Sequence, residues 1–142
     1  MHEQGSAPMR GRRVNLLDVP GLPLGSRTTR VVVAPGGPLE TAGFSLGRSH
    51  IDPGGEVPAH RHPQEEVYHV IQGAGQLRIG TDVFPARAGD FFHIPPGVEH
   101  ALVCGRDGPM ELLWVYSPAG IVDHWAQERA QLAEAGGSSP RG

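Results

Sequence analysis

The feature that most constrains this fold is a series of short apolar runs, each the length of one β-strand. Gly, Pro or Asp bounds nearly every run, and these residues end strands and form turns. In chain order the runs are TTRVVVAP, TAGFSLGRSHI, EEVYHVIQG, GQLRIGT, DFFHIPPG, HALVCG and MELLWVYSP. The 21 glycines and 14 prolines are spread between the runs rather than gathered in one tract, which is typical of turns. The pattern predicts an all-β antiparallel sandwich or barrel.

The length of 142 residues predicts one domain. Residues 1–13 and 135–142 are polar and rich in small residues, so we expect two disordered tails around a single domain over 14–134. After Pro118 the apolar residues recur at helical spacing and stop at Gly136. This spacing predicts one short C-terminal helix over about 119–134.

Composition argues against several classes of protein. The net charge of -3 provides no broad basic field for nucleic acid. No apolar run has the length of a membrane span or of a signal peptide. Cys104 is the single cysteine, so no internal disulfide can form, and we expect it to be a small buried hydrophobe. These observations predict a cytoplasmic protein with a small-molecule substrate, and the apolar runs on both strand parities predict a homodimer.

The segment HRHPQEEVYH over 60–69 concentrates potential metal ligands. His60 and His62 are two residues apart, so on a strand both side chains face the same way. Glu66 has the same parity, but a straight strand would place it about 13 Å beyond His62. Metal–ligand bonds of about 2 Å cannot span that distance. A shared site therefore requires a bend, and Pro63 lies where the bend is needed.

A second histidine arrangement occurs in AGDFFHIPPGVEHALV. Pro95, Pro96 and Gly97 predict a tight turn directly before His100, which could supply a ligand from a separate strand. Neutral imidazole is the commonest metal ligand in proteins. A set of three histidines and one carboxylate suits Mn²⁺, Fe²⁺, Ni²⁺ or Zn²⁺ without selecting among them. The sequence predicts one divalent transition metal per chain, held by His60, His62, Glu66 and His100.

Strand parity assigns roles to the neighbouring residues. After the bend, Tyr68 shares the inward parity of Glu66 and is a candidate catalytic acid or hydrogen-bond donor. His69 and His93 have outward parity, so we expect them to pack or to lie in an interface. An apolar cavity lining, which would favour a substrate of hydrophobic or aromatic character, is expected from Val70, Phe92, Ile94 and Leu102.

The two segments resemble the two motifs of the cupin superfamily. The first motif is Gly, five residues, His-x-His, three or four residues, Glu, six residues, Gly, and it is filled by Gly54, His60, His62, Glu66 and Gly73. The second is Gly, five residues, Pro-x-Gly, two residues, His, three residues, Asn, and it is filled by Gly89, Pro95, Gly97 and His100, with Cys104 in place of the usual asparagine. The resemblance covers residues 31–118, and the spacer over 74–88 is as short as in small single-domain members.

The resemblance implies a small double-sheet barrel with the metal inside and an activity of the metal-dependent members. These include dioxygenases, decarboxylases, isomerases and cyclases of aromatic polyketides. The short spacer and the strand VVVAP followed by TAGFSLGRS are similar to bacterial polyketide cyclases, so cyclisation is the first hypothesis and oxidative cleavage or decarboxylation the second. A non-catalytic module that binds a metal or a small molecule is a further alternative. Metal-free sugar epimerases are disfavoured, because the ligand set here is complete.

Overall fold

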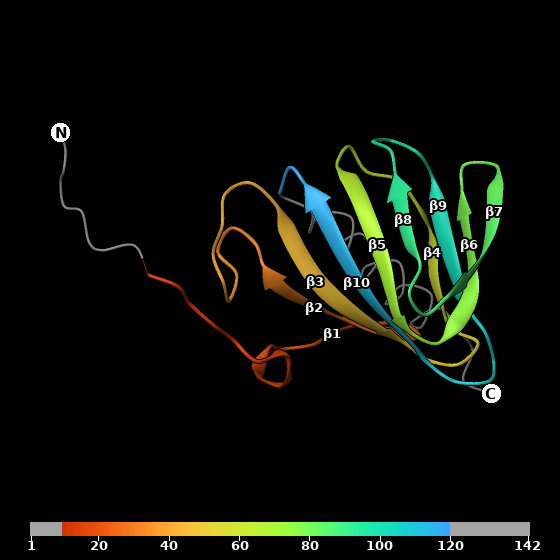
Figure 1. The fold of residues 1–142 in the computed structure, drawn as a ribbon, viewed down its shortest axis with the longest axis horizontal. Helices are drawn as coiled ribbons and strands as arrows, with labels where there is room; N and C mark the ends of the chain where they lie inside the picture. The colour runs from red at the N-terminus through yellow and green to blue at the C-terminus, as the bar shows by residue number, and fades with distance from the viewer. Residues whose placement is uncertain (1–9, 120–142) are drawn as a thin grey trace, which may run out of the picture.

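The computed structural model describes residues 10–119, whose regular structure consists of β-strands and one turn of 3-10 helix, η1 (Leu16–Asp18) (Figure 1). The strands are β1 (Leu22–Leu24), β2 (Arg27–Val33), β3 (Ser45–Ile51), β4 (Glu56–His60), β5 (Glu65–Gln72), β6 (Ala74–Ile79), β7 (Asp82–Arg87), β8 (Phe91–Ile94), β9 (His100–Cys104) and β10 (Met110–Ser117). Among these residues no helix is long and apolar enough to cross a membrane.

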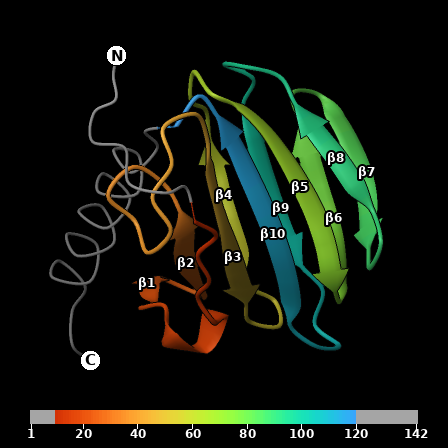
Figure 2. The same ribbon diagram turned by 60° about the vertical axis from the view of Figure 1, so that its left-hand side comes forward.

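The strands form two antiparallel sheets that face each other (Figures 1 and 2). The larger sheet has the order β1-β2-β3-β10-β5-β8, and the smaller has the order β4-β9-β6-β7. The chain crosses between the sheets several times, so strands adjacent in sequence often lie in different sheets. This architecture confirms the prediction of an all-β antiparallel fold.

Side chains alternate between the inside and the outside along the central strands of the larger sheet. Along β3 every second residue is buried, and β10 repeats the same pattern from Met110 to Tyr116. The inward apolar residues of both sheets fill one core, because stacked sheets must cover their apolar faces. Its large and fully buried members include Leu24, Ile51, Leu77, Ile94, Leu102, Met110 and Leu112.

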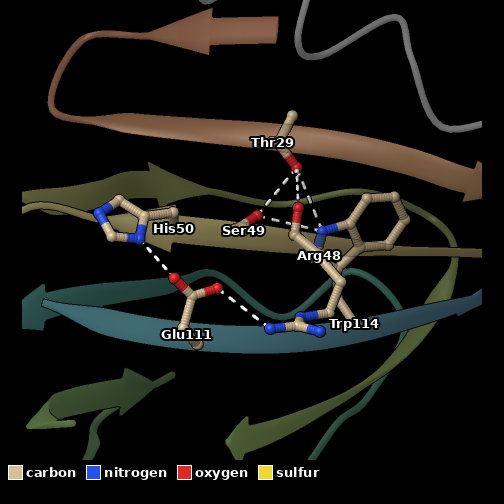
Figure 3. Close-up of polar contacts among 6 residues, drawn as sticks. All are labelled: Thr29, Arg48, Ser49, His50, Glu111 and Trp114. Atoms are coloured by element: carbon tan, nitrogen blue, oxygen red, sulfur yellow. Dashed lines mark hydrogen bonds and ion pairs between the residues drawn. The ribbon is translucent and has the colours of Figure 1, made fainter. Parts of the chain in front are cut away.

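The outer face of the larger sheet is partly charged and partly apolar. On β3 and β10, Glu111 accepts from Arg48 at 3.1 Å and also contacts His50 (Figure 3). Further along the same sheet, on β5 and β8, large apolar side chains face solvent, with Phe91 68% exposed. The outer face of the larger sheet therefore carries an exposed apolar area beside its charged part.

Several sequence predictions fall near the ends of the described chain. The predicted C-terminal helix and the tail over 135–142 lie outside the described residues. Residues 10–13 have no regular secondary structure, and Arg12 donates to the carbonyl oxygen of Glu40 at 2.7 Å. Cys104 is buried as expected, its thiol donates to the Gly108 carbonyl at 3.3 Å, and burial raises its pKa.

Candidate metal centre

The structure brings the four predicted metal ligands together from both sheets. His60 ends β4 and His100 begins β9, which pair in the smaller sheet, whereas Glu66 lies on β5 of the larger sheet. His62 lies in the connection between β4 and β5. One ligand atom from each of these four residues lies within 4.8 Å of the others. The chain turns between His62 and Glu66, as the spacing required, and thereby passes from one sheet to the other.

The turn of the second motif is tied directly to the first motif. Gly97 has a φ of 76°, which a residue with a side chain rarely adopts. Its N–H donates to the carbonyl oxygen of His62 at 2.8 Å. The tight turn before His100 is therefore hydrogen-bonded to the backbone of His62, which links the two motifs.

All three imidazoles are oriented by the same kind of backbone contact. The Nδ1 atoms of His60, His62 and His100 lie 2.8, 3.0 and 2.9 Å from the carbonyl oxygens of Pro58, Gln64 and Val98. A carbonyl oxygen can only accept, so each Nδ1 must carry the proton. In a neutral ring Nε2 is then the lone-pair atom, and outer contacts of this kind are typical of metal-ligating histidines.

The Nε2 atoms of His62 and His100 each lie next to an acceptor, not a donor. Oε1 of Glu66 lies 3.2 Å from Nε2 of His62 and 3.1 Å from Nε2 of His100. Nε2 of His100 and Oε2 of Glu66 are buried without a hydrogen-bond partner among the described residues. Converging lone pairs repel each other unless a proton or a cation lies between them. A bound cation removes this repulsion, so the donor set fits a metal ion of the borderline class.

The cluster is shielded from solvent on most sides. Glu66 is 1% exposed and His100 is fully buried. The rings of His60 and His100 lie 4.2 Å apart, and the ring of Tyr116 packs edge-on against His62 at 4.8 Å. Tyr116 hydrogen-bonds to Glu66, but Oε2 of this buried carboxylate has no hydrogen-bond partner among the described residues, which is a second reason for a cation at this position.

A small cavity of about 10 Å³ lies beside His60 and Glu66, with room for about one water molecule. It is lined by Arg27, Thr29, Ser49, Val57, His60, Glu66, Tyr68, Leu112, Trp114 and Tyr116. Tyr68 faces this cavity, and its ring lies 6.0 Å from that of His100. The inward parity predicted for Tyr68 therefore places it beside the cluster.

The expected apolar lining of the cavity requires correction. Val70, Ile94 and Leu102 are buried in the hydrophobic core, and Phe92 packs against that core. None of these four residues lines the cavity beside the cluster. Parity correctly places them inside, but it cannot separate an inward residue that fills the core from one that borders a cavity.

Five lining residues with polar groups were not predicted from the sequence: Arg27, Thr29, Ser49, Trp114 and Tyr116. Tyr116 lies on β10, and burial raises the pKa of its phenol well above the ordinary value, with the nearby charge of Glu66 acting in the same direction. Arg27 begins β2 and is 4% exposed. Strand parity could have placed Tyr116 inside, because it shares the parity of Met110, Leu112 and Trp114 on β10. Nothing local in the sequence marks Arg27.

A hydrogen-bonded group closes the wall of the cavity at β2, β3 and β10 (Figure 3). The hydroxyls of Thr29 and Ser49 lie 2.8 Å apart, and the indole N–H of Trp114 donates to them at 3.2 and 3.1 Å. All three residues are buried. Their polar groups satisfy one another, so this wall is polar and fixed in position.

The two remaining histidines of the motifs do not reach the cluster. His69 is stacked on Phe91 at 3.9 Å, and its Nδ1 lies 3.1 Å from the Asp90 carbonyl oxygen. His93 is exposed and contacts the carboxylate of Glu65. Both side chains lie on the outer face, as their parity predicted.

Comparison with known proteins identifies the family. Residues 47–116 match the family described as cupin domain, and this range contains every member of the cluster. The chain belongs to the cupin superfamily. Among solved cupin folds, it is similar to the polyketide cyclase RemF from Streptomyces resistomycificus, at 22% identity and a TM-score of 0.66, with 86% of this chain and 94% of that chain covered. At this identity the likeness concerns the fold alone.

Curated relatives of this cupin match over shorter lengths. A putative germin-like protein 3-4 of Oryza sativa is 37% identical over 92 residues, which cover 58% of this chain and 40% of the relative. A 5-nitrosalicylic acid 1,2-dioxygenase of a Bradyrhizobium species is 33% identical over 61 residues, covering 43% and 30%. The chain thus spans less than half the length of both relatives.

Proposed function

We propose that this cupin is a metal-dependent enzyme for a small oxygenated substrate. His60, His62, Glu66 and His100 are the proposed ligands of one divalent transition metal, of which Mn, Fe, Ni and Zn are the candidates. The observation that carries the proposal is the orientation of the three imidazoles, whose Nδ1 atoms contact backbone carbonyls and whose Nε2 atoms face the cluster. His69 on the outer face makes the same Nδ1 contact, so the feature that favours ligation is that Nε2 of His62 and of His100 also converges on the buried carboxylate of Glu66.

A divalent ion at this position would polarise a carbonyl or carboxylate oxygen of the substrate. Four protein ligands leave positions open in the larger coordination shells of Mn, Fe and Ni. The cavity beside His60 and Glu66 supports access to these positions, since it is large enough for about one water molecule.

Two tyrosines provide hydrogen-bond donors beside the proposed ligands. Tyr68 lines the cavity and is proposed to donate a proton or hydrogen bond to the substrate. Burial and the charge of Glu66 raise the pKa of Tyr116. Its phenol therefore keeps its proton and can donate a hydrogen bond to an anionic neighbour. The hydrogen-bonded wall of Thr29, Ser49 and Trp114 fixes the part of the cavity next to Tyr116, since the rings of Trp114 and Tyr116 lie 4.9 Å apart.

The relatives bear on the choice of reaction more than the cavity does. A cavity of about 10 Å³ has room for about one water molecule, so its size does not rank cyclisation against oxidative cleavage or decarboxylation. One relative carries the name of a dioxygenase, and one structure of similar fold is that of a polyketide cyclase, so both reactions stay candidates. The substrate, a cytoplasmic location and a homodimer remain predictions.

Substitution with Co²⁺ tests whether the proposed centre is open to ligands. If the protein leaves coordination positions free, azide and acetylacetone should shift the visible spectrum of the cobalt form, because each can displace bound water. His93→Gln is a matched control on the outer face, and its spectrum should respond as in the wild type. The Tyr68→Phe variant should bind cobalt normally and slow any turnover.

The alternative is a non-catalytic module in which the metal only stabilises the fold. A cobalt spectrum that responds to neither probe, in a protein with one bound ion per chain, would support that alternative and contradict the enzyme. Absence of bound cobalt would contradict both.

A further inference from the structure

The segment before β1, residues 10–19, is called the arm here, and it presents a leucine to solvent. Leu17 lies in η1 and is 89% exposed. The Asn15 side chain accepts from the Leu17 N–H at 2.8 Å, and the Arg30 side chain donates to the Val19 carbonyl oxygen at 3.1 Å. Because these contacts fix the backbone, little further conformational entropy is lost when another surface covers the leucine.

A second apolar feature, the β5–β8 patch, lies on the outer face of the larger sheet and consists of Val67, Ile71 and Phe91. These side chains are 36%, 40% and 68% exposed. The Phe91 ring is stacked on His69 at 3.9 Å, which fixes its orientation. Neighbouring apolar side chains that are exposed together are typical of protein–protein contacts.

The arm and the patch lie at opposite edges of the larger sheet but at the same level along its strands. One row of paired residues crosses the sheet and consists of Arg30, Arg48, Leu113, His69 and Phe91. The arm is bonded to the first member of this row, and the patch contains the last. Figure 1 shows η1 beyond β1, whereas β8 forms the other edge of the sheet.

A two-fold axis parallel to the strands would exchange these two edges. The order β1-β2-β3-β10-β5-β8 places three strands on each side of an axis between β3 and β10. If two copies stack the outer faces of their larger sheets about this axis, β1 of one copy lies over β8 of the other. Each arm then meets the patch of the other copy, and the two contacts are identical, as in a closed two-fold dimer. Near the axis, the outer face presents the partly exposed Leu46, Leu113 and Val115.

The charges along the arm complement those along β5. In Figure 1 the arm descends toward η1, and β5 descends in the same direction from its first residue, Glu65. Arg13 precedes Leu17 by four residues, and Glu65 precedes His69, the partner of Phe91 in the sheet, by four residues. Four residues span at most about 13 Å in either segment. Arg13 is exposed and the Glu65 side chain is 53% exposed, so opposite charges face each other when the leucine covers the patch.

We propose that this chain forms a two-fold dimer in which Leu17 of each copy packs on the β5–β8 patch of the other. Arg13 of one copy and Glu65 of the other form the polar edge of each contact. The contact joins two different surfaces, so it differs from a dimer in which patch packs on patch. It requires no metal and is independent of the proposed function.

Light scattering on the full chain at micromolar concentration tests the contact. The wild type should have the mass of a dimer, and Leu17→Lys or Phe91→Glu alone should weaken the dimer by at least about tenfold, because each removes an apolar side chain from two contacts. An equimolar mixture of the two variants should form a mixed dimer, because one contact is then that of the wild type and the other pairs the introduced lysine with the introduced glutamate. A tag on one variant allows the mixed dimer to be isolated and its mass measured.

Val83→Lys is the control, because Val83 is 54% exposed on β7 of the smaller sheet. This variant should remain a dimer. A monomeric wild type would refute the proposal, and so would a Leu17→Lys variant that dimerises as tightly as the wild type. Two variants that are monomeric alone and stay monomeric in the mixture would also refute it.

A second pair of variants applies if Phe91→Glu does not fold. Arg13→Glu and Glu65→Lys should each weaken the dimer by about threefold or more, because each puts like charges together in both contacts. The double variant restores opposite charges and should dimerise as the wild type does. A double variant that dimerises no more tightly than either single variant would refute the proposed pairing of arm and patch.

Discussion

Replacement of Glu66 by glutamine should stabilise the metal-free protein and weaken metal binding. Oε1 of Glu66 lies 3.2 and 3.1 Å from the Nε2 atoms of His62 and His100, which are acceptors when Nδ1 is protonated. A glutamine amide in the same position can direct one N–H to each ring. The substitution therefore replaces two repulsive contacts by two hydrogen bonds, while it removes the anionic metal ligand.

The expected gain follows from the number of contacts. A net hydrogen bond contributes about 0.5–1.5 kcal/mol, so two contribute about 1–3 kcal/mol to the free energy of unfolding. Removal of a carboxylate that is 1% exposed acts in the same direction. For a domain of this size, the melting temperature should rise by about 4–12 °C. Metal affinity should fall by a factor of at least about ten, since a neutral amide oxygen is a weaker ligand than a carboxylate.

Thermal unfolding in the presence of a chelator measures the first effect, and titration with Co²⁺ measures the second. Glu65→Gln is the matched control: its carboxylate is on the exposed face beside His93, where an ion pair contributes about 0–1 kcal/mol. That control should bind metal as the wild type does. A metal-free Glu66→Gln protein that melts below the wild type, or that binds cobalt with unchanged affinity, would refute the reasoning.

Three further predictions follow from the described contacts. Trp114→Phe should lower the free energy of unfolding in urea by about 1–3 kcal/mol, because the buried hydroxyls of Thr29 and Ser49 lose their donor; an unchanged value would contradict this role. The raised pKa of Tyr116 predicts that the free energy of unfolding declines once the pH exceeds about 10, the pKa of an unfolded tyrosine. The Tyr116→Phe variant should show a smaller decline than the wild type, and equal declines would contradict the role of Tyr116. Light scattering should give the mass of a dimer, with Phe91→Glu shifting it to a monomer, and a monomeric wild type would exclude the expected interface.

Much of the fold could be predicted, because its sequence signals are local. Strand-length apolar runs between glycines and prolines gave the all-β class, and the alternation along β5 correctly placed Tyr68 inside and His69 outside. The position of the bend between His62 and Glu66 followed from the reach of a metal–ligand bond. These features depend on backbone geometry that neighbouring residues determine.

The cavity could not be predicted in the same way, because it depends on which inward rows of the two sheets meet. Val70 and Leu102 have the correct parity, yet they fill the core. Arg27 reaches the cavity from the first residue of β2, far from both motifs in the sequence. Contacts between sheets are non-local, so no short pattern in RTTRVVV marks its first residue as a cavity residue.

The metal content of the purified protein tests the central claim most directly. We expect about one transition-metal ion per chain by elemental analysis, and none in the double variant His60→Ala, His62→Ala. Circular dichroism should show that the double variant retains its β-structure, since both side chains lie at or beyond the end of β4 and outside the hydrophobic core. A folded double variant that carries as much metal as the wild type would contradict the account.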